Sequence, residues 1–92
     1  MDFEWDPKKD QSNRRKHEVN FSEASTVFGD PMELTIYDLD HSEDEHRFLS
    51  MGRSSSGRLL VVSYTEREEN RIRIINARVA TATEIKRYES EC

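Results

Sequence analysis

Basic side chains that could bind phosphate occur in two parts of this sequence. One group is the run "NRRKH" at residues 13–17, and the other is spaced through the second half of the chain: Arg47, Arg58, Arg67, Arg71, Arg73 and Arg78. A guanidinium is a rigid fork of N–H donors that matches two oxygens of a phosphate. A sheet that gathers these arginines would form a basic surface suited to nucleic acid. The run at 13–17 has a second interpretation, as a solvated helix end whose cations match the helix dipole.

The net charge of −5 hides a division between acidic and basic segments. Residues 30–46 hold seven acids and no Lys or Arg, whereas residues 47–87 hold nine bases and four acids. Local charge of one sign predicts the kind of partner that a surface attracts. We therefore expect an acidic loop and a basic sheet that meet different partners.

The segment "RIRIINARVA" at 71–80 begins as a half-buried strand and then loses its alternation. Ile72 and Ile74 point to one side, but the same alternation would put Arg78 on the isoleucine side. One interpretation is a β-bulge that turns Arg78 toward a cleft, as bulges often do beside active sites. The other is that the strand has ended by Asn76 and that Arg78 is solvated.

The elements that must position these residues form an α+β domain over 1–92: two N-terminal helices, about four antiparallel strands and a C-terminal helix. Asp6 and Pro7 mark the start of the first helix, and Thr81 and Glu84 form a capping box at the start of the last. The first helix has no apolar residue from 8 to 18, so ordinary core packing does not explain it. Its inward stripe is predicted to contain Lys9, Ser12 or Asn13, and Lys16.

Several function classes are excluded or disfavoured by what the sequence lacks. No apolar run approaches the roughly 20 residues of a membrane span, and no secretory signal is present, so we expect a cytoplasmic protein. A single cysteine, Cys92, excludes an intramolecular disulfide. His41 and His46 lie in an acidic loop, and their spacing is poor for a metal site. The segment "GRSSSG" is predicted to form a hairpin turn and not a phosphate-binding loop. We therefore predict no metal and no cofactor.

Three aromatic residues could stack on unpaired bases, because arginines interleaved with aromatics are typical of single-stranded RNA recognition. They are Trp5, Tyr64 and Tyr88. Core packing is the favoured interpretation for Trp5 and Tyr88. Both interpretations remain open for Tyr64.

The blocks W-D, K-H-x-V-x-F, H-S-E-x-E-x-R, G-R-S, E-R and I-R-I-I-x-A-R resemble, in order and spacing, the BrnT toxins of bacterial type II toxin–antitoxin pairs. The resemblance covers nearly the whole chain. It implies a RelE-like fold and a ribonuclease that blocks translation. It also implies a BrnA antitoxin with a DNA-binding ribbon-helix-helix part, in a heterotetramer of two toxins and two antitoxins. The matching positions are Trp5, Lys16, His17, Phe21, Glu66, Arg67, Arg73, Arg78 and Tyr88.

Metal-independent RNA cleavage would need proton transfer and stabilisation of the charge that develops on the phosphate. His17, the only histidine outside the acidic loop, is the candidate acid or base. Arg67, Arg73 and Arg78 are the candidates for phosphate stabilisation. The predicted RNA-binding residues are Lys9, Arg14, Lys16 and Tyr64.

One position departs from the pattern of the family. Its members usually read I-S-A-R in the last strand, and here Asn76 replaces the serine, so a catalytic hydroxyl at that position is not assumed. Two alternatives to a live ribonuclease stay open. One is a binding protein that does not cleave RNA, and the other is a degenerate toxin that retains only antitoxin binding.

Overall fold

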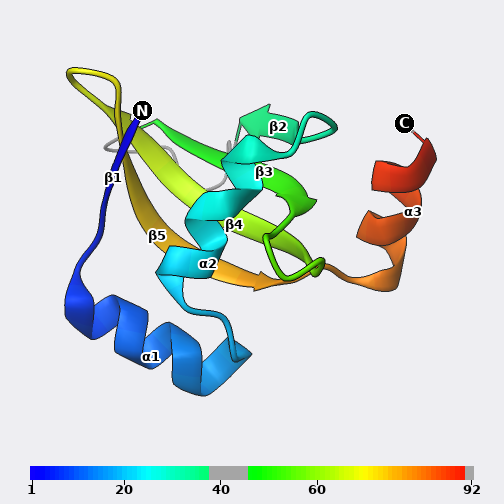
Figure 1. Ribbon diagram of the computed structural model, residues 1–92, viewed down its shortest axis with the longest axis horizontal. Helices are drawn as coiled ribbons and strands as arrows, with labels where there is room; N and C mark the ends of the chain where they lie inside the picture. The colour runs from blue at the N-terminus through cyan, green and yellow to red at the C-terminus, as the bar shows by residue number, and fades with distance from the viewer. Residues whose placement is uncertain (38–45, 91–92) are drawn as a thin grey trace.

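A five-stranded mixed sheet forms the centre of the computed structural model, which describes residues 1–37 and 46–90 (Figure 1). The strand order is β1-β5-β4-β3-β2, with bounds β1 Asp2–Glu4, β2 Leu34–Tyr37, β3 Arg47–Arg53, β4 Leu59–Arg67 and β5 Arg71–Val79. Strands β2 to β5 pair antiparallel, and β1 runs parallel to β5. The predicted antiparallel sheet of about four strands is wrong in strand number and in the direction of one strand. The opening "DFEWD" is strand-like in sequence, but so short a segment does not predict that β1 joins the sheet or which strand it pairs with.

Three α-helices accompany the sheet: α1 (Pro7–His17), α2 (Phe21–Ser25) and α3 (Ala82–Ser90). The first begins where predicted, since the Asp6 side chain accepts a hydrogen bond from the Lys8 N–H at 2.9 Å. The second is shorter than predicted, because only five residues are α-helical before a 3-10 turn, η1 (Thr26–Gly29), follows. None of the described helices is long and apolar enough to cross a bilayer. Two residues considered in the sequence lie outside the described part of the chain: His41, within residues 38–45, and Cys92.

The larger core lies on one face of the sheet, beneath α2 and η1 (Figure 1). Phe21, Ala24 and Val27 from these segments are fully buried against strand residues such as Leu60 and Ile74. Side chains from both elements alternate inward with the expected periods for helix and strand. Helix α2 and the turn η1 therefore cover this face of the sheet.

A smaller core lies on the opposite face, where α3 covers only one end of the sheet. Ala80, Ile85 and Tyr88 pack there against Met51 and Val61. The Tyr88 hydroxyl donates a 2.6 Å hydrogen bond to Asp30, which fixes the far end of the helix. Elsewhere this face carries polar and basic side chains of the sheet together with Leu49 and Ile75.

Helix α1 is attached to the sheet by a polar side chain in place of an apolar stripe. Its one buried residue is Asn13, which is 4% exposed. The Asn13 amide donates to the carbonyls of Val19 (2.8 Å) and Ala77 (2.7 Å) and accepts from the Ala77 N–H (3.1 Å). Strand β1 pairs with β5 only as far as Arg73. Asn13 therefore makes with Ala77 the two hydrogen bonds that a neighbouring strand would make.

A second polar cluster joins α2 to the hairpin between β3 and β4. The Glu23 carboxylate accepts hydrogen bonds from both Nε and Nη2 of Arg58 and from the hydroxyls of Ser54 and Ser56, at 2.5–3.1 Å. The hydrogen bond from Arg58, with burial opposing it, lowers the pKa of Glu23 to about 2. Arg58 also donates to the Glu18 carbonyl. The segment "GRSSSG" is thus the predicted hairpin turn, and Arg58 serves the fold.

Replacement of Asn13 by Leu is expected to destabilise the protein by about 2 to 4 kcal/mol. The change leaves buried backbone groups of Ala77 and Val19 without their partners, and each unpaired buried group carries a desolvation penalty. Urea unfolding followed by circular dichroism measures the difference. Gln11→Ala, an exposed position on the same helix, is the control and should change stability little. Equal stability of Asn13→Leu and the wild type would contradict this account of α1.

Glu23 is expected to stabilise the protein at neutral pH and to lose this effect as the pH falls. Its pKa in the folded protein is about 2, below the ordinary value of 4.5, so the stabilisation is complete above pH 4.5 and is lost as the pH falls toward 2. The difference in unfolding free energy between the wild type and Glu23→Gln should therefore shrink over that interval. Urea unfolding at a series of pH values measures it, and a constant difference would refute the assignment.

Candidate active site

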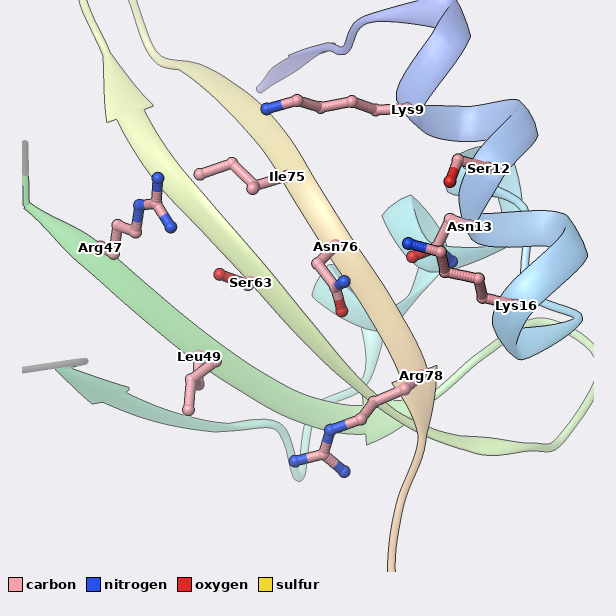
Figure 2. Close-up of a pocket in the computed structure, with 10 residues that line it drawn as sticks. All are labelled: Lys9, Ser12, Asn13, Lys16, Arg47, Leu49, Ser63, Ile75, Asn76 and Arg78. Atoms are coloured by element: carbon pink, nitrogen blue, oxygen red, sulfur yellow. The ribbon is translucent and has the colours of Figure 1, made fainter. Parts of the chain in front are cut away.

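A cleft of about 620 Å³ opens on the sheet face that α3 leaves uncovered, between α1 and strands β3 to β5 (Figure 2). Figure 2 shows the side chains that line it: Lys9, Ser12, Asn13, Lys16, Arg47, Leu49, Ser63, Ile75, Asn76 and Arg78. Among these described residues four are cationic and none is acidic. The cleft therefore attracts anions, although the chain as a whole is negative.

A β-bulge in β5 shapes the floor of the cleft. Ser63 of β4 lies opposite Asn76, while the next residue, Tyr64, lies opposite Ile74, so Ile75 is the extra residue. Ile75 and Asn76, although adjacent in sequence, both line the cleft. The added residue also restores the alternation, because Ile74 and Ala77 are both buried in the larger core. Of the two interpretations of this segment the bulge is correct, and the strand continues to Val79.

The bulge brings Arg78 to the cleft face of the sheet, where α3 holds it. Arg78 Nη1 and Nη2 donate to the two carboxylate oxygens of Glu84 at 2.7 and 2.9 Å. Arg78 lines the cleft and Glu84 does not, and both side chains are partly solvated, at 36% and 28% exposed. This hydrogen bonding raises the pKa of Arg78 and lowers the pKa of Glu84 to about 2, so both groups remain charged near neutrality.

The opposite wall of the cleft is α1, and it contributes the stripe predicted from the sequence. Lys9 and Lys16 are seven residues apart, two helical turns, and therefore project from the same face. Figure 2 shows Lys9 extending across β5 on the cleft side. Because Asn13 lies between them and bonds to β5, these ammonium groups are held beside the sheet.

Arg67, Arg73 and Arg14 lie outside the lining of the cleft. Arg73 is on the same face of the sheet but pairs with Glu4 of β1 at 3.1 Å. Arg67 is at the end of β4, opposite Arg71, and Arg14 is exposed on α1. His17 is half-buried in the last turn of α1 and is also not among the lining residues. Of the eight predicted site residues, Lys9, Lys16 and Arg78 are brought together.

Tyr64 belongs to the larger core and is only 4% exposed. Its ring centre lies 4.9 Å from that of Phe28 and 5.6 Å from that of Phe48, so both neighbours cover it. Burial raises the pKa of its hydroxyl, which accepts a hydrogen bond from Ser50 at 3.2 Å. A base cannot reach this ring without disrupting the core, and the predicted stacking role is corrected accordingly.

The remaining aromatic candidates also serve the fold. Trp5 packs edge-on against Phe21, with ring centres 6.1 Å apart. Tyr88, a residue of α3, is buried in the smaller core. Both therefore have the core role that was favoured. Arg53 lies over the Tyr88 ring, 5.6 Å from its centre, which covers that ring as well.

Other cleft residues were missed because they depend on register. Leu49 and Ser63 line the cleft because the pairing of β3 with β4 places them there, and Ile75 lines it because of the bulge. Glu84 was recognised only as part of a capping box. Its pairing with Arg78, six residues earlier, requires the chain to turn between β5 and α3.

Comparisons with known proteins bear on the family and the fold of the chain. The family described as "Ribonuclease toxin, BrnT, of type II toxin-antitoxin system" matches residues 5–84. No curated protein sequence matches the chain. The crystal structure of the Brucella abortus ribonuclease toxin BrnT is similar, with a TM-score of 0.65 and 18% sequence identity over 88% of this chain and 97% of that one.

The match to the family model and the structural similarity support different conclusions. At 18% identity the crystal structure supports the fold alone. The family model covers most of the chain, from Trp5 in the first described segment to Glu84 in α3. The chain therefore belongs to the BrnT family of ribonuclease toxins of type II toxin–antitoxin systems.

Proposed function

We propose that this protein is a cytoplasmic endoribonuclease that cuts RNA without a metal ion and thereby blocks translation. The observation that carries the proposal is the cleft with four cations and no acid among its described lining residues. The RNA backbone is a regular array of negative phosphates, and binding to such an array is dominated by Lys and Arg contacts. The family supplies the reaction class, and the cleft supplies a place for it.

The scissile phosphate binds at the Arg78 wall of the cleft. Cleavage by the neighbouring 2′-hydroxyl places additional negative charge on the phosphate oxygens, and a fixed guanidinium stabilises that charge. Lys9 and Lys16 hold the backbone from the side of α1, and Arg47 is the fourth cation of the lining. His17, in the last turn of α1 and outside the described lining of the cleft, is our candidate acid or base for proton transfer.

The floor of the cleft suits an unpaired nucleotide. Leu49 and Ile75 offer apolar contact beside the hydroxyl of Ser63 and the amide of Asn76. Proteins that read RNA sequence commonly bind unstacked bases by a combination of apolar contact and hydrogen bonds. Single-stranded RNA is therefore the proposed substrate.

Membership of a type II family implies an antitoxin partner. We propose an antitoxin of the BrnA type, with a ribbon-helix-helix part that binds operator DNA, and an assembly of two toxins with two antitoxins. Such a partner would silence the enzyme until it is removed. The purified toxin must be freed of it before any assay.

Replacement of Arg78 by Ala is expected to lower RNA cleavage by about 100-fold or more, the usual effect of removing one group that stabilises transition-state charge. The assay follows discrete products from total RNA in excess EDTA, with and without translating ribosomes. Arg87→Ala, an exposed arginine of α3, is the matched control and should cleave like the wild type. Circular dichroism should show that both variants are folded.

Full activity of Arg78→Ala would refute its catalytic role. Intact RNA with the wild type under both conditions would refute the ribonuclease proposal. If the wild type then still bound RNA tightly, the alternative of a binding protein without catalysis would be favoured. Loss of cleavage in EDTA, restored by a divalent cation, would contradict metal independence.

Joint replacement of Lys9 and Lys16 by Gln is expected to weaken RNA binding and its dependence on salt. Two lost phosphate contacts should reduce the slope of log affinity against log salt by about 1.4 for a single strand. Fluorescence anisotropy with a 2′-deoxy oligonucleotide, which lacks the nucleophile, measures this slope. Joint replacement of the exposed Lys8 and Lys86 by Gln changes the net charge equally and is the control. Equal slopes for the two double variants would place the binding surface elsewhere.

A further inference from the structure

The guanidinium of Arg78 has donors left over after its pairing with Glu84. A guanidinium carries five N–H groups. Glu84 accepts one from each terminal nitrogen, and the Val79 carbonyl lies at 3.5 Å from one of the same nitrogens. The Nε–H and a neighbouring terminal N–H therefore remain for a phosphate. Arg78 can hold a carboxylate at its end and a phosphate at its side at the same time.

Glu84 is itself fixed by the start of α3. Its Oε1 accepts the Thr81 N–H at 2.8 Å, and its own N–H lies 3.3 Å from the Thr81 hydroxyl, which completes a capping box. The carboxylate is thus bonded to the backbone on one side and to Arg78 on the other. It has little freedom to follow a moving guanidinium.

The helix that carries Glu84 is anchored on the sheet at a second point. Ile85 and Tyr88 pack into the smaller core, and the Tyr88 hydroxyl bonds to Asp30. Asp30 in turn accepts the backbone N–H groups of Met32 and Arg53 at 2.9 and 2.8 Å. These contacts fix α3, and with it the Glu84 carboxylate, relative to the strands that form the cleft.

We propose that Glu84 is a positioning residue, which fixes the Arg78 fork so that its free donors face the scissile phosphate. The proposal rests on the proposed function and adds to it a role for α3, which contributes no lining residue to the cleft. A long arginine side chain has many rotamers, and the bidentate pairing selects one of them before substrate binds. Glu84 acts through Arg78 and does not touch the RNA.

The opposite role would be competition, in which Glu84 masks Arg78 and must be displaced by the phosphate. The two roles predict opposite effects on affinity and on activity when the carboxylate is removed. A competing carboxylate lowers affinity and activity, so its removal raises both. A positioning carboxylate supports both, so its removal lowers them even though one negative charge has been taken from a site that binds an anion.

Glu84→Gln keeps the shape of the side chain and an oxygen for the Thr81 N–H, but removes the charge and the bidentate pairing with Arg78. We expect kcat to fall about 10- to 100-fold with a small change in KM, since misplacement of a catalytic group mainly affects the transition state. Glu89→Gln, an exposed position of α3 with the same change in net charge, is the control and should leave kcat unchanged. Cleavage at or above the wild-type rate in Glu84→Gln would overturn the proposal.

A double-mutant cycle separates positioning from a general structural role. In an Arg78→Ala background Glu84→Gln should have no further effect on the residual cleavage, because the group that it positions is gone. A persisting 10- to 100-fold loss in that background would show that Glu84 acts through the fold, and would also overturn the proposal.

Binding of the 2′-deoxy oligonucleotide tests the proposal independently of cleavage. Glu84→Gln should bind about 3- to 10-fold more weakly than Glu89→Gln, despite equal net charge. Tighter or equal binding by Glu84→Gln would favour competition or no role. If the wild type binds this probe but cuts no RNA, the ribonuclease proposal fails, while this binding comparison still decides the role of Glu84.

Discussion

The amide of Asn13 is the contact on which the site depends. Helix α1 has no apolar face, and its described polar contacts with the rest of the fold are made by Asn13, its one buried side chain, and by Asp10, which accepts the Phe21 N–H at 2.9 Å. The hydrogen bonds to Ala77 continue the sheet after β1 has ended, and they place the helix along the edge of the strand that carries Asn76 and Arg78. A polar helix is thereby held next to a polar sheet face, and the space between them is the cleft. An apolar contact would have filled that space with side chains.

Clear local signals allowed much of the fold to be predicted. Asp6 with Pro7 and Thr81 with Glu84 mark two helix starts, and the apolar segment around Leu60 marks a central strand. The opening segment is strand-like in sequence, but the place of β1 in the sheet was not predicted, because its parallel pairing depends on a partner 69 positions away, Arg71 opposite Asp2. The family resemblance identified the class of protein, which composition and periodicity alone did not.

The site was predicted only in part, for a physical reason. Residue type indicated Lys9, Lys16 and Arg78, because cations suit phosphate wherever they lie. The roles of the other predicted residues depend on where the fold places them. Arg58 and Arg73 pair with carboxylates of the fold. Tyr64 is buried in the core, although its hydroxyl would also have suited an exposed position. Ile75 entered the cleft through a bulge that the broken alternation in "RIRIINARVA" suggested but did not prove.

The two sides of the cleft come from distant parts of the described chain: Lys9 and Lys16 project from α1, whereas Arg78 lies on β5 and is paired with Glu84 of α3. During synthesis on the ribosome, the strands and α1 emerge before residues 82–90. Until that last segment docks, Arg78 lacks its carboxylate partner. Helix α1 can therefore dock on β5 before Arg78 acquires that partner, so the two sides of the cleft are completed at different stages of folding.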